Sequence, residues 1–323
     1  MSSLKRKKYF WSGVLFLLCI LVMPVRADAG WVRKGGYRYY YTESGKMLRC
    51  RKKKIGKATY YFDKKGRMLK NTMKTVKGKQ YYFGRNGKAV KGWLTLDGSK
   101  YYFNAEGVGA KGLVAIGKNS YYFAEDGKMQ TGWQYFGTKK AYFQPESGRM
   151  AVNREIDGQK INKKGYAKMT NADKSMLQAL EKAEAILQSV TSPGMSRSQK
   201  LRVAYDYMTS KTRFSYATWQ SFSEYDGWIY DYANQIYDRR AGNCYNFACG
   251  FAVLAKVIGY EPNVILGRIH GSRDGAADGF TRHAFVQIDG CYYDPELKWA
   301  GEMDIYGYGG YPLTWKYLGT RAL

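Results

Sequence analysis

In this 323-residue chain, the residues best suited to catalyse a reaction are a cysteine, a histidine and an aspartate. Cys244 follows Gly242-Asn243, and apolar residues recur behind it at three- and four-residue steps as far as Gly259. This pattern predicts an amphipathic helix that begins at Cys244, with Asn243 as its N-cap. Free N–H groups and the positive dipole end at that position favour a thiolate. Cys244 is therefore a candidate nucleophile, the alternative being a buried, inert cysteine.

A predicted β-hairpin brings the other two residues together. Asp289-Gly290 separates two alternating runs and is a strong signal for a two-residue turn. With these residues in the turn, His283 faces Glu296, and Asp294 is its diagonal neighbour on the same face. We expect His283 to take the proton of Cys244 and return it to a leaving amine, while Asp294 orients the imidazole.

Other candidates for chemistry are weaker. His270, the second of two histidines, lies in a Gly-rich stretch and is expected to be solvated. The backbone N–H of Cys244 is the natural first donor of an oxyanion hole, and Trp219 and Trp228 are guesses for the second, with core packing the favoured role for both. Two histidines and scattered acids give no ligand spacing, so we expect no metal and no cofactor.

Several helices and strands must position these residues. Apolar periodicity predicts a helix over 173–190, and Ser196-Arg197-Ser198-Gln199 is a capping box that opens a second. A third helix is predicted over 226–238. Residues 263–266 are expected to form a strand, followed by a polar loop over 267–282.

The preceding part of the chain, residues 30–168, is repetitive, with a period of 20 or 21 residues. Each repeat holds an aromatic triplet between two glycine turns. The triplets begin at Tyr39, Tyr60, Tyr81, Tyr101, Tyr121 and Ala141. This order predicts one β-hairpin per repeat. A single hairpin cannot bury its aromatic face, so we expect the units to stack into a β-solenoid.

Charge separates the same two parts of the chain. Residues 28–168 hold 32 Lys/Arg against 10 Asp/Glu, a net charge of +22, whereas residues 169–323 hold 16 of each. A rigid polycation would adhere to anionic phosphate polymers. Nucleic acid is the alternative partner. We expect no binding of nucleic acid, because the lysines are spread over every repeat and the chain begins with an export signal.

That export signal is predicted over residues 1–29. Four basic residues precede a short apolar stretch, and small-residue cleavage sites follow it. The apolar stretch is shorter than the roughly 20 residues that a membrane span needs, so we expect secretion and no transmembrane anchor after signal cleavage. The four remaining cysteines do not form a tidy disulfide framework, and at least one free thiol is expected in the second half.

The repeats, above all Lys91 to Phe103, resemble the cell-wall-binding repeats of Gram-positive surface proteins. In the choline-binding branch, the resemblance implies aromatic pockets that hold a quaternary ammonium by cation–π contact. A Gly-Trp pair survives only at residues 30–31, 92–93 and 132–133, a departure that counts against choline. The candidate wall-binding residues are Trp31, Trp93, Tyr101, Tyr102, Tyr121, Tyr122 and Trp133.

The second half resembles the bacterial transglutaminase-like domain. The residues that carry the resemblance are Gly242-Asn243-Cys244, His283-Ala284-Phe285 and Tyr293-Asp294-Pro295. It implies a papain-like α+β core, with the cysteine helix packed on an antiparallel sheet, and it assigns Cys244, His283 and Asp294 as catalytic. Phe285 departs from the tryptophan that is frequent in the family.

Together these features predict an α+β papain/transglutaminase-like core over residues 169–323, preceded by an all-β hairpin-repeat solenoid over residues 30–168. The expected function is that of a secreted, cell-wall-associated thiol acyltransferase or hydrolase acting on protein or peptide amides. Its partners are the bacterial cell wall, through anionic polymers or peptidoglycan, and a protein or peptide substrate. The alternatives are a cell-wall peptidase (a thiol protease) of the same superfamily and a non-catalytic adhesion or structural protein.

Overall fold

The computed structural model describes residues 29–218, 221–273 and 275–323. The predicted signal peptide therefore lies outside the described residues, apart from Ala29. The chain divides into two compact units, which we call unit 1 (residues up to 134, with 141–165) and unit 2 (135–140, with 166–323). Within the described ranges, no helix has the length and hydropathy needed to cross a bilayer.

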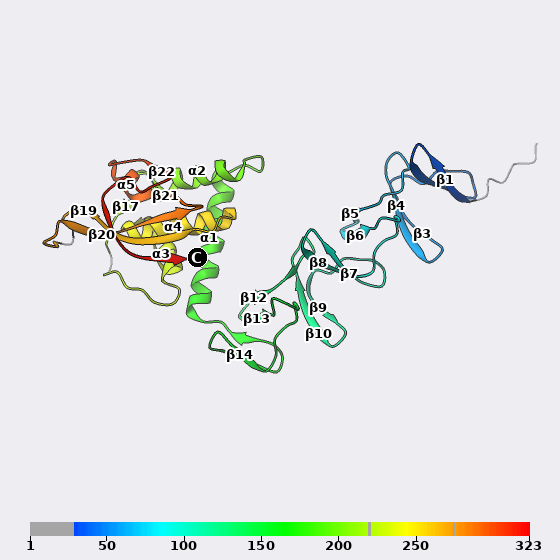
Figure 1. Cartoon of the computed structure of the whole chain (residues 1–323), viewed down its shortest axis with the longest axis horizontal. Coiled ribbons are helices and arrows are strands. Elements are labelled where there is room, and N and C mark those ends of the chain that lie inside the picture. Colours follow the sequence, from blue (N-terminus) through cyan, green and yellow to red (C-terminus); the bar gives the residue numbers. More distant parts are fainter. Residues whose placement is uncertain (1–28, 219–220, 274) are drawn as a thin grey trace, which may run out of the picture. The chain divides into compact units, whose positions relative to one another are not determined.

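Unit 1 is built from β-hairpins (Figure 1). Its paired strands are β1 (Gly30–Lys34) and β2 (Tyr37–Tyr41), β3 (Arg51–Ile55) and β4 (Ala58–Phe62), β5 (Thr72–Val76) and β6 (Lys79–Phe83), β7 (Gly92–Leu96) and β8 (Ser99–Phe103), β9 (Gly112–Ile116) and β10 (Asn119–Phe123), and β14 (Arg154–Ile156) and β15 (Gln159–Ile161). The predicted glycine turn between the strands of a repeat is confirmed, and it holds two residues, as at Asp97 and Gly98, whose φ angles are 49° and 74°.

The hairpin β12 (Gly132–Phe136) and β13 (Lys139–Phe143) contributes its tip, residues 135–140, to unit 2. Two short strands complete this part of the chain, β11 (Met129–Gln130) beside β10 and β16 (Ala167–Lys168) beside β13.

Successive hairpins hold one another through buried rings and backbone hydrogen bonds. The phenylalanine that ends each triplet after the first is almost fully buried, as Phe62 and Phe83 are, whereas Tyr41 in the first is half-buried. Backbone N–H groups reach back to the preceding repeat, from Met68 to the carbonyl of Arg38 and from Ala89 to that of Thr59, each at 2.8 Å. The hairpins form separate sheets rather than one continuous sheet.

Unit 2 contains five helices among its described residues. They are α1 (Asn171–Val190), α2 (Arg197–Met208), α3 (Trp228–Arg239), α4 (Cys244–Ile258) and α5 (Pro295–Ala300). The capping box predicted at Ser196 is confirmed. The sequence predicted that the cysteine helix would bury one apolar face. In the structure α4 is buried on every side from Cys244 to Ala255.

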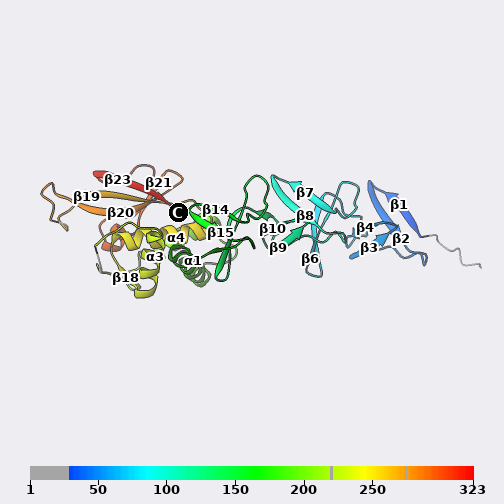
Figure 2. The same ribbon diagram turned by 90° about the horizontal axis from the view of Figure 1, so that it is seen from below.

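A five-stranded sheet in the order β22-β21-β20-β19-β23 packs on α4 (Figure 2). Its strands are β19 (Asn263–His270), β20 (Phe280–Ile288), β21 (Cys291–Asp294), β22 (Ile305–Tyr308) and β23 (Trp315–Ala322). Pairs within it are antiparallel. A separate short parallel pair, β17 (Ser215–Tyr216) and β18 (Ala241–Gly242), leads into α4.

The predicted loop over 267–282 is wrong at both ends. β19 continues to His270 and β20 begins at Phe280, so the connection between the two strands is shorter than predicted. Because β19 lies between β20 and β23, its backbone groups form hydrogen bonds on both edges. These hydrogen bonds stabilise a strand over 267–270, although the polar composition of these residues favours a loop. His270 therefore ends a strand; it is exposed, and its ring lies 4.3 Å from that of Phe280.

Candidate active site

Cys244 occupies the first position of α4, as predicted. The Asn243 side chain accepts hydrogen bonds from the N–H groups of Tyr245 (3.1 Å) and Asn246 (3.5 Å), and the Asn246 side chain accepts one from the Asn243 N–H. A Cβ at Gly242 would lie 2.4 Å from the Cβ of Asn246, so close approach, not a left-handed backbone, requires glycine there. This capping box fixes the sulfur at the positive end of the helix dipole.

The four described cysteines, Cys50, Cys244, Cys249 and Cys291, are free thiols. Cys244 is 4% exposed, and its Sγ lies 4.0 Å from the carbonyl oxygen of Arg282 on β20. Cys249 lies deeper in α4, and burial raises the pKa of its thiol well above the ordinary value, which keeps it protonated. Cys291 is half-buried on β21.

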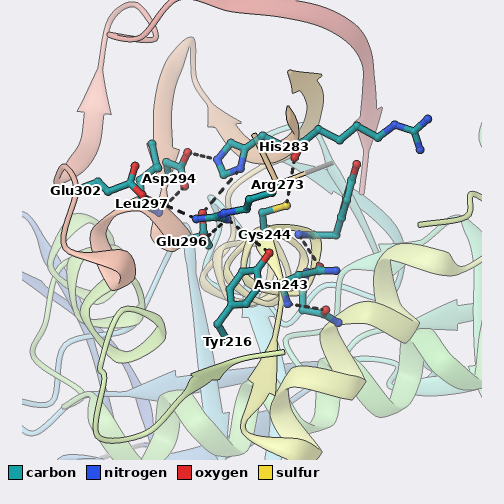
Figure 3. A network of polar contacts seen from close by, with 12 residues as sticks. Tyr216, Asn243, Cys244, Arg273, His283, Asp294, Glu296, Leu297 and Glu302 are labelled. Carbon is teal, nitrogen blue, oxygen red and sulfur yellow. Dashed lines mark hydrogen bonds and ion pairs between the residues drawn. The ribbon is translucent and has the colours of Figure 1, made fainter. Parts of the chain in front are cut away.

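The hairpin predicted to bring His283 and Asp294 together is present. Asp289 and Gly290 form its turn, with φ angles of 50° and 80°, and Ile288 pairs with Cys291. The Nε2 atom of His283 lies 2.6 Å from Oδ2 of Asp294, and both side chains are buried. The structure thus brings the predicted histidine and aspartate into hydrogen-bond contact, and Figure 3 shows His283 beside the Cys244 side chain.

The strand partner expected for His283 is wrong. β21 ends at Asp294, and α5 begins at Pro295, so Glu296 lies in a helix and not opposite His283 on a strand. The ring of Pro295 provides no N–H for a ladder, while the Asp294 side chain accepts a hydrogen bond from the Leu297 N–H at 3.1 Å. Asp294 therefore serves both as the partner of His283 and as the N-cap of α5.

The electrostatic surroundings favour a charged imidazole. Burial alone lowers the pKa of His283, but the Asp294 carboxylate and the Cys244 thiol outweigh it and raise this pKa well above its ordinary value. Because Nε2 is engaged by Asp294, Nδ1 is the ring nitrogen left for Cys244. A thiolate next to an imidazolium is the resting form of an activated cysteine nucleophile.

Tyr311 is a site residue that the sequence did not reveal. Its hydroxyl donates to Oδ2 of Asp294 at 2.5 Å, and burial raises its pKa, so it keeps its proton. Its ring stacks on Phe285 at 4.0 Å. Tyr311 lies in an irregular segment between β22 and β23, where no periodicity or motif marks it.

Glu296 and Arg273 form a second group that sequence reasoning missed as a site (Figure 3). Glu296 is 1% exposed; its Oε1 accepts from Arg273 at 3.0 Å, and its Oε2 lies 3.8 Å from Nδ1 of His283. Burial raises the pKa of Glu296. Arg273 also lies 5.1 Å over the ring of Tyr216, which β17 places next to the start of α4.

Replacing Arg273 with alanine is expected to destabilise the protein by about 1–3 kcal/mol, because it leaves a buried carboxylate without its cation. The folded-state pKa of Glu296 is already raised, so its charge costs stability increasingly as pH rises through that pKa. Thermal unfolding should therefore show a larger loss at pH 8 than at pH 5. In a Glu296→Gln background the same substitution should cost less; equal losses would contradict this role.

Donor atoms of His283, Asp294 and Glu296 lie within 4.8 Å of one another, the spacing of a metal site. Their partners fit a cation poorly. Asp294 is engaged by His283, whose raised pKa favours the protonated ring, and Glu296 is paired with Arg273. The arrangement is instead suited to hold and transfer a proton.

Of the two tryptophans considered for the oxyanion hole, the structure describes Trp228. Trp228 is 5% exposed and packs edge-on against Phe222 and Tyr232, which places it in the core. Trp219 lies outside the described residues.

The candidate wall-binding residues separate into two groups. Trp93 is 44% exposed, and its ring lies 5.2 Å from that of Tyr102 and 4.9 Å from that of Tyr121. Trp31 and Trp133 contact the middle tyrosine of their own hairpins in the same way. Tyr101 and Tyr121 are both buried, and Tyr122 packs on Phe143, so all three take part in the packing between repeats; Tyr121 also contacts Trp93.

Comparison with protein-family models gives three matches. Residues 73–108 and 110–154 match a choline-binding repeat, residues 53–68 a putative cell wall binding repeat, and residues 184–301 the transglutaminase-like superfamily. These are the families, in the order, that the sequence predicts. A search of curated protein sequences gives no match.

Three solved structures from Streptococcus pneumoniae are similar to this chain. CbpJ is 29% identical over 43% of this chain and 48% of its own, with a TM-score of 0.39. Choline binding protein F, solved with a peptidoglycan analogue, is 33% identical over 44% and 47%, with a TM-score of 0.39. A separate choline binding domain is 32% identical over 25% and 96%, with a TM-score of 0.23. The chain spans about half the length of the first two.

Proposed function

We propose that this chain, in which choline-binding repeats precede a transglutaminase-like domain, is a cell-wall-associated thiol acyltransferase or hydrolase acting on protein or peptide amides. One observation carries the proposal. Cys244 begins a capped helix beside His283, and His283 lies 2.6 Å from the carboxylate of Asp294. These are the nucleophile, base and orienting acid of a cysteine-dependent acyl transfer.

In the first half-reaction the Cys244 sulfur, having given its proton to His283, attacks the carbonyl carbon of a carboxamide. The C–N bond breaks, and the departing nitrogen takes the proton that His283 holds. Ammonia or an amine leaves, and the acyl group remains on sulfur as a thioester. The backbone N–H of Cys244 is the first donor available to the developing oxyanion.

In the second half-reaction an acceptor loses its proton to His283 and attacks the thioester, which returns the thiol. A lysine amine as acceptor gives a cross-link, whereas water gives a carboxylic acid, the product of a deamidase or peptidase. The degree to which the site excludes water decides between them. Peptidase action on peptidoglycan stem peptides is the second candidate, favoured by the wall-binding repeats that precede this domain.

We propose that the repeats retain the secreted protein at the wall, as a β-solenoid of stacked hairpins. Its net charge of +22 over residues 28–168 supports adhesion to anionic wall polymers, and the separation of this charge from the neutral second half supports a division of labour. Export follows from the predicted signal peptide.

The proposal is tested by offering the protein a glutamine peptide, a labelled primary amine and purified peptidoglycan, beside its Cys244→Ala variant. We expect the wild type to release ammonia and to join the amine to the peptide, to convert glutamine to glutamate, or to cleave stem peptides, and the variant to yield none of these above background. Mass spectrometry of the products identifies the reaction. No product from the wild type, or equal product from the variant, would instead favour the non-catalytic alternative.

A further inference from the structure

Several aromatic rings of unit 1 are covered by cations of the chain itself. The guanidinium of Arg38 lies 4.4 Å from the centroid of Trp31, and Nζ of Lys52 lies 4.1 Å from that of Tyr81. Nζ of Lys74 lies 5.6 Å from that of Tyr61. A quaternary ammonium held by cation–π contact needs such a face, so at these rings the protein occupies the position with its own charge.

The Trp93 hairpin repeats the geometry of the Trp31 hairpin, except for this cover. Trp31 lies 5.3 Å from Tyr40 and 4.8 Å from Tyr60, close to the 5.2 Å and 4.9 Å of Trp93 to its two tyrosines. Lys100 precedes the aromatic triplet of its hairpin just as Arg38 does. The Lys100 Nζ, however, donates to the carbonyl oxygen of Glu146 at 3.4 Å, and the Trp93 ring remains 44% exposed.

A pocket of about 290 Å³ opens beside this ring. It is lined by Trp93, Leu94, Thr95, Lys100, Tyr121, Ser147 and Arg149. The described lining thus offers two aromatic rings, three hydroxyls and two cations, with no carboxylate among its residues. Two like charges repel a quaternary ammonium, whereas lysine and arginine together attract an oxyanion, and a guanidinium can bind one through two parallel hydrogen bonds.

We propose that this pocket binds an oxyanion carried on a sugar, with the sugar ring against Trp93 and the oxyanion between Lys100 and Arg149. The ligand chemistry is that of a phosphodiester-linked or carboxylate-bearing wall glycan, and choline is excluded. The inference rests on the proposed wall-binding role of unit 1 and is independent of the thiol site.

The test titrates the full chain with glucose 1-phosphate, glucuronate, glucose and choline, and follows tryptophan fluorescence and calorimetric heat. We expect at least one of the two anionic sugars to bind about tenfold or more tightly than glucose, choline to bind no better than glucose, and added salt to weaken the anion. The preferred anion shows whether a phosphate or a carboxylate is the natural group. Choline binding more tightly than both anionic sugars would overturn the proposal.

A matched pair of variants assigns the binding to the pocket. Lys100→Gln with Arg149→Gln is expected to lose about tenfold or more of the affinity for the anionic sugar. Lys91→Gln with Lys118→Gln, which removes the same charge from exposed positions outside the lining, should stay within about twofold of the wild type. Equal losses of affinity in both variants would show that the overall positive charge attracts the anion, and would overturn the assignment of binding to this pocket.

Retention on purified cell walls separates failure of this inference from failure of the wall-binding role. If the wild type is retained and both double variants are retained alike, the pocket proposal fails and wall binding stands. If the wild type is not retained even at low salt, the wall-binding role fails as well.

Discussion

Cys244→Ser is expected to lower kcat/KM on an amide substrate by about 10⁴-fold or more, because a serine hydroxyl is a much weaker nucleophile than a cysteine sulfur. The substitution changes one atom at the N-terminus of α4 and leaves the Asn243–Asn246 capping box intact. Steady-state kinetics on the substrate identified by the product assay measures the loss, and thermal unfolding shows whether the fold is retained.

Thiol labelling provides the matched control. Iodoacetamide at neutral pH should modify Cys244 in the wild type faster than the exposed thiol of Cys50, and this fastest phase should vanish in Cys244→Ser. Cys291→Ser removes a half-buried thiol on β21 and should leave both the fast phase and the activity within about twofold. Cys249 should react slowly, since burial raises the pKa of its thiol. A fast phase that survives in Cys244→Ser would refute the assignment.

Asp294→Asn is expected to lower kcat by about 10³–10⁴-fold. An amide N–H facing Nε2 of His283 stabilises the tautomer with its proton on Nδ1, the nitrogen that should accept the proton of Cys244. The sign of the pH effect follows from the same contact. Asp294 raises the pKa of His283, so without its charge this pKa falls and the imidazolium loses its proton at lower pH. The alkaline limb of the kcat/KM profile should therefore move to lower pH.

Asp294→Ala separates the catalytic role from the capping role. Asparagine can still accept the hydrogen bond from the Leu297 N–H, whereas alanine cannot, so the alanine variant should lose a further ~1 kcal/mol of stability. Both variants should show the same loss of activity within about tenfold. If the asparagine variant kept the wild-type pH profile, Asp294 would have no part in tuning His283.

The parts of the site that could be predicted are those coded by neighbouring residues. Gly242, Asn243 and the apolar run after Cys244 specify a capped helix start, and Asp289-Gly290 specifies a tight turn. Because side chains alternate along strands, the turn alone placed His283 and Asp294 on one face. These local rules need no knowledge of the rest of the fold.

The parts that could not be predicted depend on segments distant in sequence. Tyr311 and Arg273 reach Asp294 and Glu296 from irregular segments whose paths are set by the whole sheet. The end of β21 at Asp294 reflects a competition between a strand ladder and a helix cap, which Pro295 decides. Helix α4 is buried on every side because the sheet and other helices enclose it, a feature of packing rather than periodicity.

Recombination among genes that carry such repeats would have to preserve one ion pair, between Lys140 and Asp173. Lys140 precedes its aromatic triplet as Arg38 and Lys100 do, yet its Nζ lies 2.7 Å from Asp173, and both side chains are almost fully buried. Asp173 also closes the capping box of α1 with Thr170. A hairpin from another gene that lacks a lysine at this position would leave the buried carboxylate of Asp173, in the first turn of α1, without its cation. The hairpin of β12 and β13 should therefore be inherited together with α1, a constraint that this ion pair does not place on the hairpins before it.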